Sequence, residues 1–170
     1  KATSNICTAQ VLLAVVAGMY GVWHGPEGLQ AIAKRVHEFT KRLAATLHDQ
    51  GYEINHDSFF DTLHVKVGDA VTDIERRARG SEINLRYDAE GAVVVALDET
   101  VTEADFEDLC NIFGVSTTRE EWGGIKESLR RTSTFMTDPV FHRYRSETEM
   151  MRYLNRLKSR DLSLTTSMIP

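Results

Sequence analysis

The chain has 170 residues, of which 42% are hydrophobic and 26% are charged, and its 20 basic and 25 acidic residues give a formal net charge of −5. This length fits one ordinary domain with appendages, and the apolar fraction is sufficient for a core. The acidic balance argues against a primary nucleic-acid binder or a polybasic membrane surface, so we expect no nucleic acid and no membrane as partners.

A helix over the apolar residues 11–23 is the first predicted element. The run is shorter than the roughly 20 residues of a membrane span, so a buried helix is favoured. Its small residues recur at helical spacing and would let another backbone approach closely: Ala14, Ala17, Gly18 and Gly21. Because the chain opens on Lys1 without an initiator Met, we expect part of the packing partner to lie outside it.

A second helix is predicted from Pro26, which suits a first helical turn, to Gly51, which ends the pattern. Its apolar residues recur at helical spacing, and its opposite face should be exposed to solvent. The apolar residues are Leu29, Ile32, Ala33, Val36, Phe39, Leu43 and Leu47, and the polar ones are Lys34, Arg35, Glu38, Lys41 and Arg42.

Alternating apolar and polar residues predict strands over 52–54 and 59–67. A short amphipathic helix follows over 69–79. Residues 83–87 and 92–97 then alternate on either side of an acidic turn, which is typical of a β-hairpin. These patterns predict an α+β fold of two layers, with an antiparallel sheet of about three or four strands and helices on its covered face.

Potential capping residues mark the starts of later helices, and a glycine pair interrupts the region between them. The cap pairs are Thr102 with Asp105, Thr118 with Glu121, and Ser146 with Glu149. The first of these helices should end at Gly114 and the last at about Arg160. The pair Gly123 and Gly124 follows no strand, so we interpret it as a helix interruption rather than a phosphate loop.

No catalytic constellation is evident among the titratable residues, so we expect no catalytic residue and no metal ligand in this chain. The six histidines lack ligand spacing, and His37 and His48 would lie roughly 16 Å apart on one helix. We therefore interpret the histidines as surface or hydrogen-bonded groups. We interpret Cys7 and Cys110 as small buried residues of a protein in a reducing compartment. Lys1 and Lys126 would need desolvation or a cationic neighbour to form a Schiff base.

Many separate segments, in order along the whole chain, resemble the P-proteins of the glycine cleavage system, the glycine decarboxylases. The segments are 1–10 (KATSNICTAQ), 24–26 (HGP), 59–63 (FFDTL), 97–101 (LDETV), 131–133 (RTS), 144–148 (YRSET), 152–153 (RY) and 167–170 (SMIP). One short motif could match by chance, but this ordered series is specific.

The resemblance implies a long polypeptide of two similar halves, each with the architecture of a fold-type I pyridoxal-phosphate enzyme. Residues 1–23 then resemble a buried linker helix from the preceding large domain. Residues 24–160 look like the small domain that closes the first half, and residues 161–170 look like the link toward the catalytic half.

For activity, the resemblance implies an oxidoreductase that decarboxylates glycine with pyridoxal phosphate and passes the aminomethyl group to the lipoyl arm of the H-protein. The family's Schiff-base lysine follows a histidine and precedes a glycine-rich loop, and no His-Lys pair or run of glycines occurs here. We therefore expect no cofactor bound to this chain and no activity from it alone.

Thr3, Ser4 and Asn5 are the residues that could reach an active site, by donating hydrogen bonds to substrate or phosphate. The same residue types are good helix N-caps, so capping is the alternative interpretation. Expected partners are glycine, the lipoylated H-protein, the remaining domains of the same polypeptide and a second copy in a homodimer. The resemblance implies a cytoplasmic protein in a bacterium and a mitochondrial matrix protein in a eukaryote.

A second hypothesis from a different class stays open at this point. Small α+β domains with antiparallel sheets often serve as metabolite-binding or regulatory modules without catalytic activity, and fold alone does not choose between the two.

Overall fold

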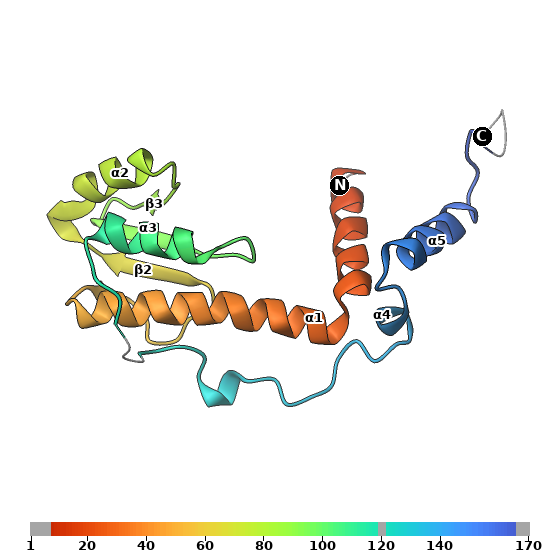
Figure 1. The fold of residues 1–170 in the computed structure, drawn as a ribbon, viewed down its shortest axis with the longest axis horizontal. Helices are drawn as coiled ribbons and strands as arrows, with labels where there is room; N and C mark the ends of the chain where they lie inside the picture. The colour runs from red at the N-terminus through yellow and green to blue at the C-terminus, as the bar shows by residue number, and fades with distance from the viewer. Residues whose placement is uncertain (1–7, 119–121, 166–170) are drawn as a thin grey trace, which may run out of the picture. The chain divides into compact units, whose positions relative to one another are not determined.

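The computed structural model describes residues 8–118 and 122–165. The chain divides into two compact units: Ala31–Thr132 forms one, and Lys1–Gln30 together with Ser133–Pro170 forms the other. Figure 1 shows the succession of helices and strands along the chain.

Helix α1, Thr8–Asp49, contains one non-helical residue, Gly25, at φ 61° and ψ −178°. Glycine tolerates this backbone conformation, and Pro26 then occupies the first turn of the segment that follows, where its missing N–H is not needed. The prediction that a second helix starts at Pro26 is confirmed. Among the described residues, no helix is both long and apolar enough to cross a membrane.

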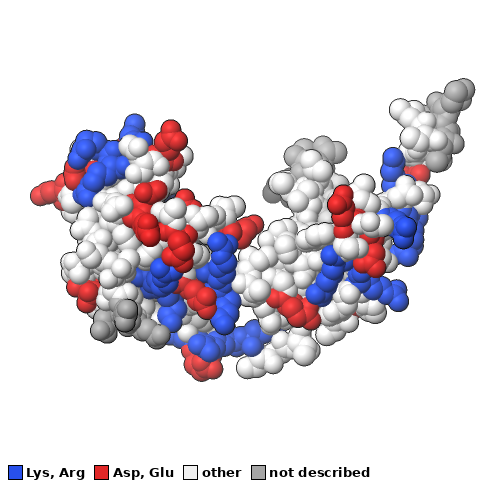
Figure 2. Space-filling view, viewed as in Figure 1, with Lys and Arg blue, Asp and Glu red and all other residues white. Residues whose placement is uncertain are grey.

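The apolar segment before this kink is exposed within the described part of the chain. Val11, Leu12, Val15 and Val16 are each more than half accessible, and Leu13 is 68% accessible. Figure 2 shows no Lys, Arg, Asp or Glu colouring on this segment. The described residues therefore do not bury this helix as expected. Its burial by other domains or by another chain stays a prediction.

One position of the small-residue stripe does meet a close neighbour. A Cβ at Gly21 would lie 3.4 Å from Met136 Cε and 3.8 Å from Phe141 Cε1, whereas a Cβ at Gly18 would meet nothing within 4 Å. Side chains of the same unit thus pack on the stripe at Gly21, and nothing described packs on it at Gly18; the close approach of another backbone stays a prediction.

The sheet has four antiparallel strands in the order β1-β2-β4-β3, which confirms the predicted three to four strands. Their bounds are Glu53–Ile54 for β1, Thr62–Lys66 for β2, Arg86–Tyr87 for β3 and Ala92–Ala96 for β4. In the central pair, Leu63 lies opposite Val95 and Val65 opposite Val93, and all four side chains are buried.

Two strands are shorter than their alternation predicts. The first part of the 59–67 run stays outside β2, because the rings of Phe59 and Phe60 pack near His37 instead. In the hairpin, Ile83 donates its backbone N–H to Ala78 O at the end of the preceding helix, so pairing with β4 begins only at Arg86.

Three helices bury their apolar faces against the inner face of the sheet. They are the second part of α1, α2 (Val71–Gly80), which follows the 3₁₀ turn η1 (Gly68–Ala70), and α3 (Glu103–Phe113). The core contains Phe39, Leu43, Ala44, Leu47, Leu63, Val65, Ile74, Ala78, Val93, Val95, Leu97, Phe106, Leu109, Cys110, Ile112 and Phe113. Periodicity had placed most of these residues on inward faces, so the α+β prediction is confirmed.

Helix α3 has the predicted capping box. Asp105 N–H donates to Thr102 Oγ1 at 3.3 Å, and Thr102 N–H donates to Asp105 Oδ2 at 2.7 Å. The helix ends as predicted at Gly114, at φ 70°. Cys110 is buried as predicted, and burial raises the pKa of its thiol. Cys7 lies outside the described residues.

The stretch after α3 differs from its prediction. Glu121, the partner expected for Thr118 in a capping box, lies outside the described residues. Gly123 and Gly124 stand in irregular backbone at φ 65° and 114°, and the described residues on both sides are not helical. The interpretation as a helix interruption is therefore wrong. The only regular turn that follows before residue 133 in the described chain is the 3₁₀ turn η2, Glu127–Leu129.

The C-terminal part of the other unit contains α4 (Val140–Arg143) and α5 (Glu147–Lys158). Ser146 Oγ accepts the N–H of Glu149, which confirms the predicted cap, and the helix ends two residues before Arg160. The rings of Tyr144 and Tyr153 stack at 4.1 Å, and Arg156 donates to the Tyr144 hydroxyl at 2.9 Å.

The hairpin turn supports a prediction about acid stability. Asp88 accepts the backbone N–H of Ala92 at 2.9 Å and lies 2.8 Å from His64 Nε2, and these contacts, the first above all, lower the pKa of its carboxyl. Because the pKa of Asp88 is depressed in the folded state, these contacts stabilise the fold. Their contribution to the free energy of unfolding is fully present above the unfolded pKa of about 4 and is lost as the pH falls through the folded pKa. Asp88→Asn should therefore flatten the loss of stability below about pH 4, measured as urea midpoint against pH. An unchanged slope would contradict this.

Candidate functional site

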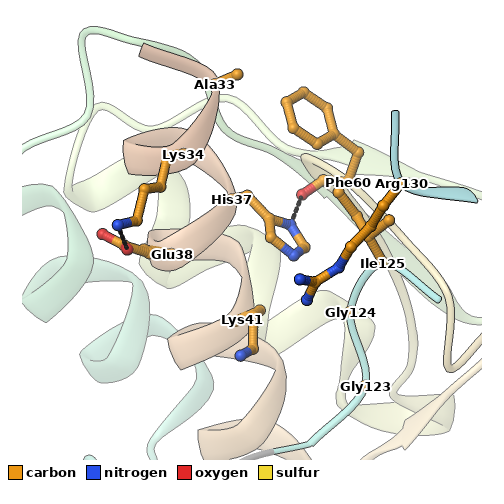
Figure 3. Close-up of a pocket in the computed structure, with 10 residues that line it drawn as sticks. All are labelled: Ala33, Lys34, His37, Glu38, Lys41, Phe60, Gly123, Gly124, Ile125 and Arg130. Carbon is orange, nitrogen blue, oxygen red and sulfur yellow. Dashed lines mark hydrogen bonds and ion pairs between the residues drawn. The ribbon is translucent and has the colours of Figure 1, made fainter. Parts of the chain in front are cut away.

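A cavity of about 480 Å³ lies between α1 and the loop that follows α3, within the unit Ala31–Thr132. We call it the His37 cavity. Figure 3 shows the residues that line it: Ala33, Lys34, His37, Glu38, Lys41, Phe60, Gly123, Gly124, Ile125 and Arg130. This size is within the range of small-molecule sites, so it is the candidate site of the unit.

The imidazole of His37 is held in one orientation. Its Nδ1 donates to the carbonyl oxygen of Phe60 at 2.8 Å, and its ring stacks on the Phe60 ring with centroids 5.8 Å apart. A backbone carbonyl can only accept, so the proton is on Nδ1, and Nε2 is left facing Gly124. The prediction that the histidines are hydrogen-bonded groups is confirmed here.

Two glycines allow the loop to close against α1. A Cβ at Gly123 would lie 2.6 Å from Phe59 Cε1 and 2.9 Å from Asp57 O, and a Cβ at Gly124 would lie 3.3 Å from His37 Nε2. Both glycines also have positive φ, which disfavours side chains. The loop is fastened by the bond from Gly124 N–H to Asp57 O at 3.0 Å.

Charged groups around the cavity are mainly basic. The lining contains three basic side chains, Lys34, Lys41 and Arg130, and one carboxylate, Glu38, which lies 3.8 Å from Lys34 Nζ. Arg130 Nε also pairs with Glu127 at 3.0 Å. Figure 3 shows the Arg130 guanidinium directed toward α1 between His37 and Lys41. Lys34 and Arg130 are thus each paired with a carboxylate.

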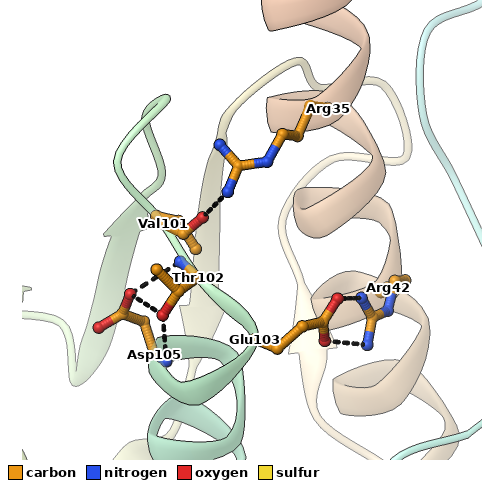
Figure 4. A network of polar contacts seen from close by, with 6 residues as sticks. All are labelled: Arg35, Arg42, Val101, Thr102, Glu103 and Asp105. Atoms are coloured by element: carbon orange, nitrogen blue, oxygen red, sulfur yellow. Dashed lines mark hydrogen bonds and ion pairs between the residues drawn. The ribbon is translucent and has the colours of Figure 1, made fainter.

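A neighbouring cavity of about 380 Å³ is built differently. Arg42 holds Glu103 through two bonds of 2.8 and 3.0 Å, and the pKa of that carboxyl is lowered by this contact. Arg35 donates to the carbonyl oxygens of Glu99, at 2.7 Å, and Val101 (Figure 4). These arginines tie α1 to the start of α3, so we assign this cavity a structural role.

The predicted site residues Thr3, Ser4 and Asn5 lie outside the described residues, so their placement stays a prediction. The sequence did not predict the His37 cavity. Its only signals were the polar face of the second helix, expected to be wet, and the glycine pair. These segments are about 90 residues apart in the chain, and nothing in the periodicity indicates that they meet.

Neither a metal nor a pyridoxal-phosphate site is formed by the described residues. Within 8–118 and 122–165, no three His, Cys, Asp or Glu side chains are placed to hold a metal ion. A Schiff-base lysine needs desolvation or a cationic neighbour. No lysine of the described chain is buried, and Lys126 is exposed and paired with Asp57 at 3.3 Å. The described residues therefore do not fit the cofactor.

Comparison with known proteins gives a consistent result. Residues 1–113 match the family model described as glycine cleavage system P-protein. Proteins named glycine dehydrogenase (decarboxylating) align with the whole chain, at 51% identity in Thermosynechococcus vestitus and in Bradyrhizobium diazoefficiens and 49% in Vibrio parahaemolyticus. The chain spans 18–19% of the length of these relatives. It belongs to the glycine cleavage system P-protein family.

Proposed function

We propose that a polypeptide containing this chain decarboxylates glycine with pyridoxal phosphate and passes the aminomethyl group to the lipoyl arm of an H-protein. The observation that carries this proposal is the identity of about 50% over the entire chain to glycine dehydrogenases (decarboxylating). Pyridoxal phosphate supplies an electron sink in such chemistry when it is bound. The corresponding location would be the cytoplasm in a bacterium or the mitochondrial matrix in a eukaryote.

Within that enzyme, we assign this chain a structural and interface role. The unit Ala31–Thr132 has its own core, and the described lysines lack the burial that a cofactor lysine requires. The exposed apolar side chains of segment 11–16 supply a surface that other domains of the same polypeptide, or a second copy, would cover.

We expect the 170-residue chain to be inactive on its own. With pyridoxal phosphate and lipoylated H-protein added, it should give no exchange between bicarbonate and the glycine carboxyl, because its described lysines cannot replace a buried Schiff-base lysine. The measurement is incorporation of labelled bicarbonate into glycine.

The matched control is the full-length gene product assayed with the same H-protein, which should exchange label. Activity of the isolated chain, together with a stoichiometric lysine adduct reducible by borohydride, would contradict the structural role. Failure of the full-length product with both H-protein and cofactor present would instead contradict the proposed reaction.

A further inference from the structure

The end of strand β4 has an open edge. Strand β3 pairs with β4 only opposite Val93 and Val94, so no described strand lies beside Ala96 on that side. The hydrogen bonds of an antiparallel strand alternate between its two neighbours. Leu97 N–H donates to Asp61 O on the β2 side at 3.0 Å, so the N–H and C=O of Ala96 are directed to the β3 side. Among the described residues, these two backbone groups form no hydrogen bond.

An apolar cavity lies where β3 would otherwise continue. The bond from Ile83 N–H to Ala78 O, at 2.9 Å, holds the residues before β3 away from β4, and a space of about 260 Å³ lies between residues 83–85 and 95–98. Its walls are mainly aliphatic, and the aliphatic residues are Ile83, Leu85, Val95, Ala96, Leu97, Val101 and Leu109. A strand added beside β4 would direct alternate side chains toward this cavity. The open edge and the cavity thus offer backbone partners and a side-chain site at one place.

Two carboxylates and no basic side chain line this cavity, and Arg35 lies outside the lining. Asp98 accepts hydrogen bonds from Thr100, and Asp105 accepts them from Thr102 (Figure 4). These bonds lower the pKa of both carboxyls. Within the described chain, neither carboxylate forms an ion pair, and each keeps one oxygen without a hydrogen bond. The cavity therefore favours a partner that carries positive charge.

We propose that the open edge of β4 binds an extended segment of a partner protein, which adds a strand beside Ala96. The segment places an aliphatic side chain in the cavity and brings Lys or Arg to Asp98 and Asp105. In this mode of recognition, backbone hydrogen bonds supply affinity and side-chain pockets supply specificity. The site is independent of the proposed glycine decarboxylation. It adds a protein-binding surface to a unit for which the family assignment implies only a structural role.

Nuclear magnetic resonance tests the proposal by titrating the isotopically labelled 170-residue chain with the peptide acetyl-Lys-Val-Leu-Val-Lys-amide. A saturable change is expected in the amide resonance of Ala96 and in those of residues 83–85. Methylating the three central amide nitrogens of the peptide keeps its side chains and charges but prevents strand pairing, so this version should bind at least about tenfold more weakly. A version with Glu in place of Lys should also bind more weakly. No saturable change at Ala96, or equal affinity for either altered peptide, would overturn the proposal.

The double variant Asp98→Asn/Asp105→Asn keeps an oxygen acceptor at each position and should raise the Kd for the peptide at least about threefold, because two exposed ion pairs with the peptide are lost. Its control, Asp69→Asn/Glu90→Gln, removes two negative charges near the opposite end of β4 and should change the Kd less than about 1.5-fold at an ionic strength of about 0.15 M. The spectra verify that both variants keep the fold. Equal losses in the two variants would show non-specific attraction and refute the site.

Two further measurements test the choice of a partner protein. The full-length gene product should bind the same peptide, and failure to bind would show that its other domains cover the edge. Dimerisation of the 170-residue chain that Asp98→Asn/Asp105→Asn abolishes, measured by analytical ultracentrifugation, would assign the edge to a second copy. Either result would overturn the assignment to a partner protein, and neither bears on glycine exchange by the full-length product.

Discussion

Replacing Leu43 by Ala should destabilise the unit Ala31–Thr132 by about 2–5 kcal/mol, because the substitution removes buried methyl groups and leaves a cavity. Leu43 is 0% exposed and belongs to the core cluster between α1, the sheet and α3. Urea unfolding followed by the fluorescence of Trp122, with Trp23 of the other unit replaced by Phe, measures the effect in this unit alone. The midpoint should fall while the slope with denaturant stays unchanged, as expected when the folded state loses stability but not compactness.

Leu129→Ala is the matched control, since it makes the same chemical change in the same unit at a side chain that is 68% exposed. Its effect should remain within about 0.5 kcal/mol. If the two variants unfold at the same urea concentration, the core described here does not carry the stability of the unit.

The core could be predicted because its signal is local and periodic. Leu43 and Leu47 recur on one helix face, and Leu63 and Val65 alternate with polar residues along one strand. The buried face of each element can therefore be predicted from its own residues. The capping of α3 could also be predicted, because Thr102 and Asp105 lie within one helical turn of each other. Where neighbouring segments compete for a residue, as at Ile83, the local pattern gave the wrong strand boundary.

The His37 cavity could not be predicted from the sequence, because it is formed by segments that lie far apart in the chain. Lys34 and Lys41 are ordinary surface lysines in the helical pattern, and Arg130 follows a stretch without periodicity. The prediction of a helix interruption at Gly123 and Gly124 was wrong, because a glycine pair indicates unusual backbone but does not indicate which element lies next to it. The family, by contrast, was recognisable from the order of many short segments, and the comparisons confirm it.

Replacing Gly25 by Ala should destroy the kink in α1 and the packing around it. The backbone at φ 61° and ψ −178° is a region that essentially only glycine occupies, and a Cβ there would lie 2.6 Å from the carbonyl oxygen of Phe141. It would also collide with the Arg145 guanidinium, which pairs with Glu27 at 2.8 Å. Backbone strain and overpacking each cost about 1–3 kcal/mol, so we expect a loss of about 2–6 kcal/mol in this unit.

Hydrogen exchange resolved by segment is the suitable measurement, because the chain has two units and a single melting curve would mix them. Protection should fall in α4 and α5 and stay unchanged in the sheet. Gly68→Ala is the control: its φ of +54° also disfavours a side chain, but a Cβ there meets nothing within 4 Å. It should cost only about 1–2 kcal/mol and leave α5 protected. Since the flexible Arg145 side chain can move aside but Phe141 O cannot, Arg145→Ala should not rescue Gly25→Ala. Full rescue would show that the guanidinium, rather than the backbone, requires glycine at this position.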